Sequence, residues 1–314
     1  MDPNILVVRL SSFGDLIHTL PAVAALRKVF PRSRIDWLVE TRHREVLVDN
    51  PDVDALIEVD TLGWRRRLYS PSTWREIRRS LRAIRERRYD VVLDLQGTIK
   101  SSVSAYFARS DRRIGFTASH LKERAAALLY TERVHPNGSR PHVIDRHLLL
   151  LQALGIATEE RSFPISAPRS LEAAAEGELA RMGLTEYAVV NPGGSWVTKR
   201  WSPEKFGRLA TAIHREWSLP SLVIWGPGEE SLAREVVRVA GADAARLAPT
   251  TTVRGLVPYI RRARLFVSGD TGPIHLASAC GVPAVGIFGP TDPARNGPFG
   301  PGDEVVWKNV PCGP

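Results

Sequence analysis

The stretch LFVSGDTGPIHLASACGVPAVGIFGPTDP, residues 265–293, contains the clearest structural pattern in the C-terminal half of the chain. Two short apolar runs, 265–267 and 284–288, enclose a segment with the apolar spacing of a helix. The first run stops at a Ser-Gly-Asp turn, and Pro273 suits the first helical turn, where its nitrogen needs no hydrogen bond. Strand, tight loop, helix and strand in this order predict half of a parallel α/β layer.

The loop between the first strand and the helix is a candidate ligand site. The free N–H groups of a first helical turn favour an anion above the strand ends, and Asp270 and His275 flank that position. Backbone donors, a carboxylate and an imidazole suit a nucleotide diphosphate that carries a hydroxylated sugar. Asp270 and Thr271 can also be interpreted as simple helix caps. The ligand site is favoured because open α/β sheets bind ligands in such crevices.

Composition limits the class of protein. A length of 314 residues suits two domains, and 43% hydrophobic with 25% charged residues is typical of a folded soluble protein. No apolar run is long enough to span a membrane and the N-terminus enters a strand directly, so we expect neither a membrane span nor a signal peptide. The two cysteines, Cys280 and Cys312, have no paired spacing, which argues against a disulfide framework or a zinc site and favours the cytoplasm.

The formal net charge of +9 is compatible with nucleic acid, anionic lipid or a phosphorylated substrate as a partner. Much of this charge lies in a predicted helix over 72–88, whose apolar residues recur at spacings of four and three. A solvated helix face explains most of its arginines. We interpret Arg65, Arg66 and Arg67 as a loop beside Trp64, where an anionic ligand is more plausible.

Strand and helix patterns alternate through both halves of the chain. The predicted strands are 5–10, 35–39, 56–59, 90–95, 112–116, 187–190, 222–225, 265–267 and 284–288. The predicted helices are 16–30, 45–48, 72–88, 143–154, 171–182, 203–216, 230–239 and 252–262. Residues 161–170 contain two prolines and read as a linker. We therefore predict an α/β protein with two facing Rossmann-like domains, 1–160 and 171–314, and a cleft between them.

Loops at strand ends in the C-terminal half can line one crevice. They are 191–200, 226–230, 270–275 and 289–293. They supply glycines, a cation and four carboxylates, namely Lys199, Glu229, Glu230, Asp270 and Asp292. A diphosphate requires helix N-termini and a cation, and sugar hydroxyls require carboxylate acceptors. The loops contain neither GxGxxG nor a P-loop, which disfavours a Rossmann dehydrogenase and a P-loop kinase.

In the N-terminal half Asp15 follows Gly14 at a strand-to-helix turn. It can face the cleft and act as a general base that takes the proton from an attacking hydroxyl. It can also be an acid that the helix dipole stabilises. Lys100 and Ser101 follow another strand and suit a polar ligand. His18 is interpreted as structural, and the chain has no GxSxG elbow for a catalytic serine.

Three segments resemble the bacterial lipopolysaccharide heptosyltransferases of glycosyltransferase family 9. They are VVRLSSFGDLIHTLPA (7–22), DLQGTIKSS (94–102) and SGDTGPIHLASACGVPAVGIFGPTDP (268–293). The resemblance covers nearly the whole chain and is greatest to the heptosyltransferase I group, which the basic segment WRRRLYSPSTWREIRR also resembles. It implies an inverting glycosyltransferase of the two-domain GT-B fold that transfers heptose from ADP-heptose to Kdo of the lipid A inner core. It implies neither a metal nor a cofactor, and no nucleic acid as partner.

The resemblance also implies roles for individual residues. Asp15 matches the general base of the family, and Lys199 matches the lysine that binds the donor phosphates. A carboxylate of the GPGEE loop, either Glu229 or Glu230, contacts the adenosine ribose. The implied donor site comprises Gly193, Thr198, Lys199, Glu229, Glu230, Asp270, Thr271, Gly272 and His275. The implied acceptor site comprises Ser12, Arg65, Arg66, Arg67, Gln96, Lys100, Lys122 and Arg124.

One departure from the family concerns the C-terminus. Enzymes of this fold usually end with a helix that crosses back to the N-terminal domain, whereas this chain stops at 310–314. We expect that the protein is short or the chain incomplete. We also expect a cytoplasmic protein with peripheral contact to the inner membrane, where its lipid acceptor resides.

Two other functions stay open. The chain can be a family member with another acceptor or sugar, such as a heptosyltransferase II. It can also be a non-enzymatic basic protein whose binding to nucleic acid or anionic membrane is sensitive to salt. Beyond Trp64 and Trp74, the basic helix region lacks aromatic side chains interleaved with its arginines, which argues against binding of single-stranded nucleic acid.

Overall fold

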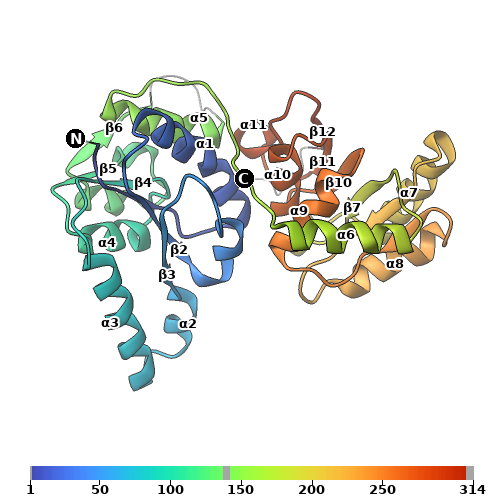
Figure 1. Ribbon diagram of the computed structural model, residues 1–314, viewed down its shortest axis with the longest axis horizontal. Coiled ribbons are helices and arrows are strands. Elements are labelled where there is room, and N and C mark those ends of the chain that lie inside the picture. The colour runs from blue at the N-terminus through green and yellow to red at the C-terminus, as the bar shows by residue number, and fades with distance from the viewer. Residues whose placement is uncertain (1, 137–141, 309–314) are drawn as a thin grey trace. The chain divides into compact units, whose positions relative to one another are not determined.

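The structure of the protein, a computed structural model, describes residues 2–136 and 142–308. The chain forms two compact units, Met1–Pro164 and Ile165–Pro314, and their boundary falls inside the 161–170 stretch interpreted as a linker. Each unit contains a six-stranded sheet (Figure 1), in the orders β3-β2-β1-β4-β5-β6 and β12-β11-β10-β7-β8-β9. All neighbouring strands pair in parallel, which confirms the predicted α/β class.

The N-terminal unit alternates strands and helices. Its strands are β1 (Ile5–Val8), β2 (Ile35–Glu40), β3 (Ala55–Val59), β4 (Val91–Asp94), β5 (Arg112–Phe116) and β6 (Glu132–Val134). Its α-helices are α1 (Phe13–Val29), α2 (Thr61–Arg66), α3 (Pro71–Arg85), α4 (Ile99–Phe107) and α5 (Val143–Leu150). Its 3₁₀ turns are η1 (Thr41–Val46), η2 (Ala118–His120), η3 (Arg124–Leu129) and η4 (Leu151–Leu154). Every residue of β1, β2 and β4 is buried, as expected of central parallel strands covered on both faces.

The C-terminal unit repeats this plan. Its strands are β7 (Ala188–Asn191), β8 (Ser221–Val223), β9 (Ala245–Leu247), β10 (Leu265–Gly269), β11 (Ala284–Phe288) and β12 (Glu304–Trp307). Its helices are α6 (Arg169–Arg181), η5 (Val197–Lys199), α7 (Pro203–Trp217), α8 (Glu230–Ala240), α9 (Val253–Arg261), α10 (Gly272–Ala279) and α11 (Pro293–Asn296). The unit predicted from residues 265–293 is confirmed as β10, α10 and β11.

Strand register brings the candidate loops of each unit to one edge. In the N-terminal sheet Ile5 of β1 pairs with Ile35 of β2 and with Val91 of β4. In the C-terminal sheet β10 lies between β7 and β11. Because the strands are parallel, the loops after β1, β2 and β4 share one edge of their sheet, and the loops after β7, β10 and β11 share one edge of theirs.

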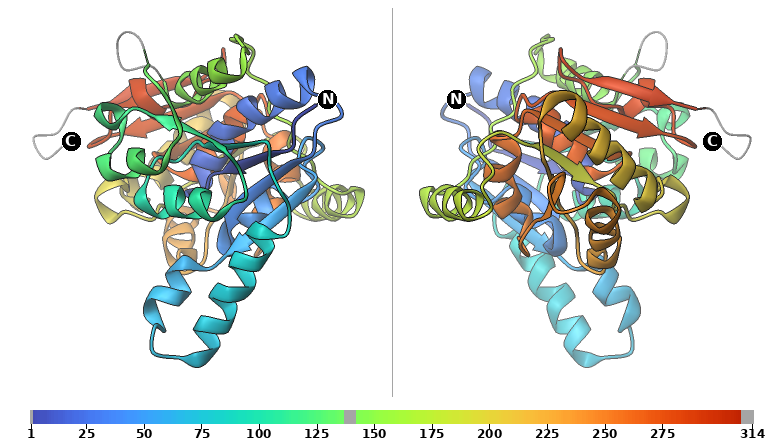
Figure 2. Two further views of the ribbon diagram at one scale, coloured as in Figure 1. Left: turned by 90° about the vertical axis from the view of Figure 1, so that its left-hand side faces the viewer. Right: turned by 90° about the vertical axis from the view of Figure 1, so that its right-hand side faces the viewer.

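The interpretation of residues 64–67 as a loop is wrong. Trp64, Arg65 and Arg66 lie in helix α2, and Arg67 ends it. The carboxylate of Asp60 accepts a hydrogen bond from the N–H of Gly63 at 2.9 Å and so caps a helix of only six residues. Together α2 and α3 project from the body of their unit (Figure 2).

Three other predictions differ in detail. The predicted helix 72–88 ends at Arg85, because the chain must turn into β4. Of the predicted helix 45–48 only residues 45 and 46 are helical, at the end of the 3₁₀ turn η1, and the predicted helix 143–154 is α5 followed by η4. Cys280 is a free thiol at the end of α10. Cys312 and residues 310–314 lie outside the described residues. Among the described residues, no helix is long and apolar enough to cross a bilayer.

Candidate active site

Asp15 lies at the start of α1, directly above the end of β1. Its Oδ2 accepts hydrogen bonds from the backbone N–H of Ser12 at 3.0 Å and from the Ser12 hydroxyl at 2.7 Å. Its Oδ1 lies 2.7 Å from Nη2 of Arg9. The carboxylate is therefore part of a capping box, as the helix-cap interpretation requires. It nevertheless keeps 35% of its side chain exposed, so a ligand can still reach it.

Arg9 fixes both the position and the charge of this carboxylate. Its side chain is only 8% exposed, and Nη1 donates to the carbonyl of Leu95 at 2.6 Å, which ties the end of β1 to that of β4. Burial alone would raise the pKa of Asp15. The Arg9 guanidinium and the two hydrogen bonds from Ser12 outweigh it and lower this pKa below its ordinary value. The Asp15 carboxylate is therefore ionised at neutral pH.

A second polar cluster lies at the end of β2. The Glu40 side chain is 2% exposed, and its Oε1 accepts from Nζ of Lys100 at 2.9 Å and from the hydroxyl of Thr61. The backbone N–H of Thr61 donates to Oε2 at 3.2 Å. The predicted acceptor residue Lys100, on α4, is thus held by a buried carboxylate at the end of β2, which is separated from β4 by β1. Burial and the charge of Arg42 lower the pKa of the nearby His43 to about 4.

The turn after β4 is organised by Asp94, which is fully buried. Its Oδ1 accepts from the N–H groups of Gln96 at 2.9 Å and Gly97 at 3.0 Å, and its Oδ2 from the Ser101 hydroxyl at 2.8 Å and the Tyr130 hydroxyl at 2.7 Å. Gly97 has a φ of +72°, and an added Cβ would lie 2.5 Å from the Leu121 side chain. This network sets the start of α4, and hence the position of Lys100.

The predicted acceptor residues fall into three groups. Ser12, Gln96 and Lys100 lie at the same sheet edge as Asp15, with Oε1 of Gln96 accepting from the N–H of Leu10 at 2.7 Å. The three arginines Arg65, Arg66 and Arg67 lie on and after α2, where Arg67 pairs with Asp60 and Glu76 at 3.5 Å each. Lys122, just before η3, and Arg124, its first residue, are exposed, and η3 packs against α4.

In the C-terminal unit the ends of β7 and β10 meet at Thr271. The amide of Asn191 donates to the Thr271 hydroxyl at 3.1 Å, and this hydroxyl lies 2.8 Å from that of Ser268. Within the described part of the chain, the Thr271 side chain caps none of the first N–H groups of α10. Those N–H groups, which begin at Gly272, can therefore bind an anion.

Lys199 and Asp270 form an ion pair at this end of α10. The Thr291 hydroxyl donates to the same Asp270 oxygen, Oδ2, at 2.7 Å. Lys199 ends η5 and is partly exposed, whereas Asp270 is almost completely buried. A cation beside an open helix N-terminus is an arrangement that suits a diphosphate. His275 is buried one turn further along α10, and Thr198 is exposed.

Glu229 and Glu230, which the sequence leaves as alternatives, have different surroundings. Glu229 accepts from the N–H groups of Gly194 at 2.7 Å and Gly226 at 3.2 Å, so it joins two of the predicted loops. Glu230 pairs with Arg234 on the exposed side of α8. An added Cβ at Gly193 would lie 2.0 Å from Oε2 of Glu229, so a larger residue at this position would have to displace the Glu229 carboxylate. The carboxylate in the loop cluster is that of Glu229.

Several residues of these clusters were not singled out from the sequence, although three of them lie in the predicted loops 191–200 and 289–293. The residues not singled out are Arg9, Glu40, Thr61, Asn191, Arg200, Ser268 and Thr291. Arg200 donates through Nε to the carbonyl of Gly194 at 2.6 Å and lies 3.4 Å from Oε1 of Glu229. Arg9 and Glu40 carried one usable signal, since Arg9 directly follows the apolar strand β1 and Glu40 ends the mostly apolar strand β2.

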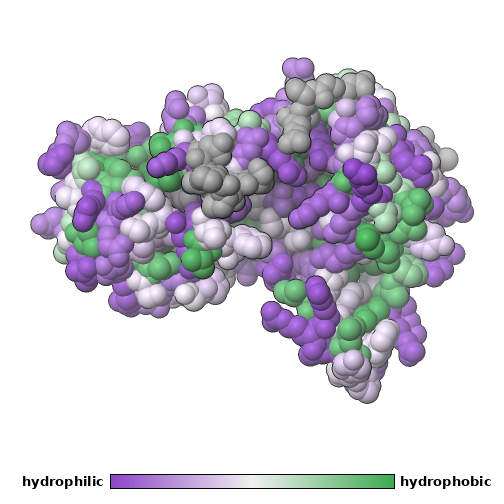
Figure 3. Space-filling model, turned by 180° about the vertical axis from the view of Figure 1, so that it is seen from behind, coloured by the Kyte–Doolittle hydropathy of each residue, from purple (hydrophilic) through white to green (hydrophobic). Residues whose placement is uncertain are grey.

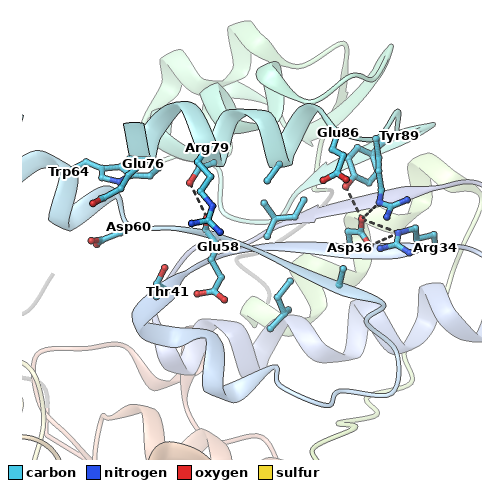
Figure 4. A pocket seen from close by; sticks show the side chains of 16 residues that line it. Arg34, Asp36, Thr41, Glu58, Asp60, Trp64, Glu76, Arg79, Glu86 and Tyr89 are labelled. Carbon is cyan, nitrogen blue, oxygen red and sulfur yellow. Dashed lines mark hydrogen bonds and ion pairs between the residues drawn. The ribbon is translucent and has the colours of Figure 1, made fainter. Parts of the chain in front are cut away.

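A pocket of about 540 Å³ lies in the N-terminal unit between β3 and α3 (Figure 4) and contains none of the predicted site residues. At one end Asp36 accepts a hydrogen bond from the Tyr89 hydroxyl at 2.8 Å and one from Nε of Arg34 at 3.2 Å. Its charge is thus compensated within the protein. Glu58, Asp60 and other polar side chains line the opposite end.

Comparison with known proteins gives consistent matches over most of the chain. The family model described as glycosyltransferase family 9 (heptosyltransferase) matches residues 77–314. Lipopolysaccharide heptosyltransferase 1 of Pseudomonas aeruginosa is 31% identical over 313 residues, which cover 99% of this chain and 85% of that protein. The enzyme of the same name from Escherichia coli K12 is 27% identical over 299 residues, covering 95% and 91%.

Solved structures give the same result. E. coli heptosyltransferase WaaC with ADP-2-deoxy-2-fluoro heptose has a TM-score of 0.80 at 26% identity, covering 96% of this chain and 92% of that one. E. coli ADP-heptose lps heptosyltransferase II has a TM-score of 0.79 at 21% identity, covering 99% and 92%. These likenesses confirm the predicted GT-B fold.

Proposed function

Because the chain belongs to glycosyltransferase family 9, the heptosyltransferases, we propose that it transfers L-glycero-D-manno-heptose from ADP-heptose to Kdo of the lipid A inner core. The observation that carries the proposal is the Lys199–Asp270 pair beside the uncapped start of α10. Family membership sets aside the non-enzymatic nucleic-acid alternative. The names of the relatives at 31% and 27% identity support the heptose and the lipopolysaccharide acceptor.

The donor diphosphate binds at Lys199 and the first N–H groups of α10, near Thr271 and Gly272. The WaaC structures contain ADP or an ADP-heptose analogue, which supports this donor. Both groups stabilise the negative charge that develops on the leaving ADP, and neither has to reorganise during the reaction. We therefore propose that the reaction uses no cofactor. Asp270 and Thr291 keep Lys199 in place through Oδ2 of the carboxylate.

Glu229 is the carboxylate that serves the adenosine ribose. Both its oxygens already accept backbone hydrogen bonds, from Gly194 and Gly226, which fixes their orientation. A carboxylate oxygen has two lone pairs, so Oε2, which accepts from Gly226, can still accept a bond from a ribose hydroxyl, whereas Oε1 accepts from both Gly194 and Arg200. Glu230 faces away with Arg234 and takes no part in donor binding.

Asp15 acts as the general base of an inverting transfer. A Kdo hydroxyl gives its proton to the carboxylate, and its oxygen forms a bond to the anomeric carbon on the face opposite ADP. The bond between that carbon and the ADP oxygen breaks, and ADP leaves with the electron pair. Arg9 keeps Asp15 ionised before the reaction. The low pKa also makes the carboxylate a weaker base, so proton transfer is expected late, as the hydroxyl becomes acidic.

The phosphorylated acceptor binds through cations of the N-terminal unit. Lys100 lies at the sheet edge that also carries Asp15, where Glu40 and Thr61 hold its ammonium group. Arg65, Arg66, Lys122 and Arg124 are exposed and can reach phosphate or carboxylate groups further out. We also propose that the protein works at the cytoplasmic face of the inner membrane, where such an acceptor is presented.

The experiment is transfer of heptose from ADP-heptose to Kdo-bearing lipid A, with the already heptosylated lipid as a second acceptor. We expect transfer to the first and not to the second. Transfer only to the heptosylated lipid would instead identify a heptosyltransferase II activity. Hydrolysis or binding of ADP-heptose without transfer to either acceptor would contradict the proposed acceptor class.

A further inference from the structure

Helix α4 carries its large apolar side chains on the outside. Its buried side consists of small residues, which are Ser101, Ser102 and Ala105. Its exposed side carries four large apolar residues, which are Ile99 (48% exposed), Val103 (38%), Tyr106 (55%) and Phe107 (37%). A surface helix ordinarily turns its apolar side toward the core. Folding of the N-terminal unit therefore does not explain the outer side of α4.

These side chains form one continuous surface. Ile99, Val103 and Tyr106 follow one another at spacings of four and three, so they project from the same side of the helix. Turn η3 packs against α4 and adds Leu128, which is 78% exposed. Figure 3 shows hydrophobic residues gathered along this part of the N-terminal unit. We call Ile99, Val103, Tyr106, Phe107 and Leu128 the α4–η3 face.

Basic residues border the α4–η3 face. Lys122 and Arg124 are exposed just before and at the start of η3. The guanidinium carbon of Arg113 lies 5.6 Å from the centre of the Tyr106 ring. Glu123 lies between the first two, but its Oε2 accepts from the N–H of Ile99 at 2.7 Å and so serves the start of α4. An exposed apolar surface with such a rim marks an interaction site.

We propose that the α4–η3 face docks the N-terminal unit onto a bilayer surface that contains anionic lipid. This inference rests on the proposed function, in which the acceptor is a lipid of such a bilayer. The apolar side chains enter the boundary between head groups and acyl chains, and the bordering cations bind lipid phosphates. Lys100 directly follows Ile99 on α4, so docking places the candidate acceptor site beside the lipid head groups.

The test is cosedimentation of the full chain with vesicles of phosphatidylethanolamine and phosphatidylglycerol that contain no acceptor lipid. The variant Val103→Ser/Tyr106→Ser/Leu128→Ser is expected to bind about tenfold more weakly than the wild type, because apolar area is lost from the interface. The matched control, Val29→Ser/Trp217→Ser/Val306→Ser, removes three side chains that are 48%, 65% and 61% exposed elsewhere. It is expected to bind as the wild type does.

Two further measurements keep the outcome clear. Wild-type binding to the anionic vesicles should weaken in 0.5 M salt, because the electrostatic screening length falls below roughly 5 Å. Wild-type binding to vesicles of phosphatidylcholine alone should be weak. Thermal unfolding checks that both variants fold. If the triple variant does not fold, Leu128→Ser alone is expected to weaken binding about threefold.

If the docking proposal is correct, the triple variant of the α4–η3 face and its control cannot bind the vesicles equally. Equal binding overturns the proposal, even if both proteins still bind the vesicles through the basic helices α2 and α3. Transfer to a water-soluble acceptor without acyl chains reports the proposed function separately, and both variants should retain it. If the wild type fails that transfer while only the α4–η3 variant loses vesicle binding, the proposed function is wrong and the docking surface stands.

Discussion

Arg9 and Asp15 form an ion pair at the carboxyl edge of the N-terminal sheet, with 2.7 Å between Nη2 and Oδ1. The arginine comes from the end of β1 and the carboxylate from the first turn of α1. Because Arg9 also donates to the carbonyl of Leu95, the pair fixes the candidate base relative to two strands. This pairing keeps the base charged and oriented, at the cost of some basicity.

Arg9→Gln should therefore move the acid limb of the activity profile. Burial raises the pKa of Asp15 and Arg9 lowers it, so removing the guanidinium raises this pKa. Activity needs the carboxylate, so in the variant kcat/KM should begin to fall at a higher pH than in the wild type. The measurement is kcat/KM against pH for both proteins. An acid limb that does not move would show that Arg9 does not set the pKa of the base.

Lys199→Ala should reduce kcat by about a hundredfold, the usual effect of removing one group that stabilises developing negative charge. It should also weaken binding of ADP, measured by calorimetry. Lys205→Ala is the matched control, since Lys205 lies on α7, 5.9 Å from the centre of the Trp201 ring, and outside the loop cluster. Equal kinetics for the two variants would remove Lys199 from the donor site.

The adjacent residues Glu229 and Glu230 provide an internal comparison. Glu229→Ala leaves the N–H groups of Gly194 and Gly226 without an acceptor, which should cost about 1–3 kcal/mol of stability and weaken ADP binding. Glu230→Ala removes only an exposed pair with Arg234, worth about 0.3–0.5 kcal/mol. Urea unfolding and ADP titration measure both effects. A larger loss of ADP affinity in Glu230→Ala would reverse the assignment.

Acid should destabilise the protein through His147, which is buried on α5 with its Nδ1 3.1 Å from the carbonyl oxygen of His18. Burial and the Arg9 charge lower its pKa to about 3 from an ordinary value of 6.5. Between these values the unfolded chain binds the additional proton, so stability falls as the pH falls from 6.5 toward 3, at up to about 1.4 kcal/mol per pH unit.

His147→Gln should flatten this dependence, and His135→Gln, which replaces an exposed histidine, should not. Urea unfolding at several pH values between 5 and 7 provides the measurement. If the free energy of unfolding of His147→Gln changes with pH as steeply as that of the wild type, His147 does not cause the pH dependence.

Sequence patterns were sufficient for the elements that are long or strongly apolar. The unit β10, α10 and β11 was predicted from two apolar runs and the turn between them. Strands β6, β9 and β12 were missed because they are short and none of them is buried throughout, whereas β8, which also has three residues, is fully buried and was predicted from its apolar residues. Helix α2 was missed because it has only six residues and its start depends on a single capping side chain, that of Asp60.

Residue types at strand ends predicted which loops matter, but not which side chains pair within them. Lys100 pairs with Glu40 across 60 positions of sequence, and Asn191 with Thr271 across 80. Such pairs depend on strand order in the sheet, and no spacing in the sequence records it. The choice between Glu229 and Glu230 likewise required the positions of Gly194 and Gly226.

The role of Asp15 is tested by comparing the wild type with Asp15→Asn in heptose transfer from ADP-heptose to Kdo-bearing lipid A. Asparagine keeps the shape and much of the helix cap, so folding and ADP binding should be retained while kcat falls by about 10²- to 10⁴-fold. That result would support Asp15 as the base of the transfer. An Asp15→Asn protein that binds ADP and retains most of its turnover would contradict it.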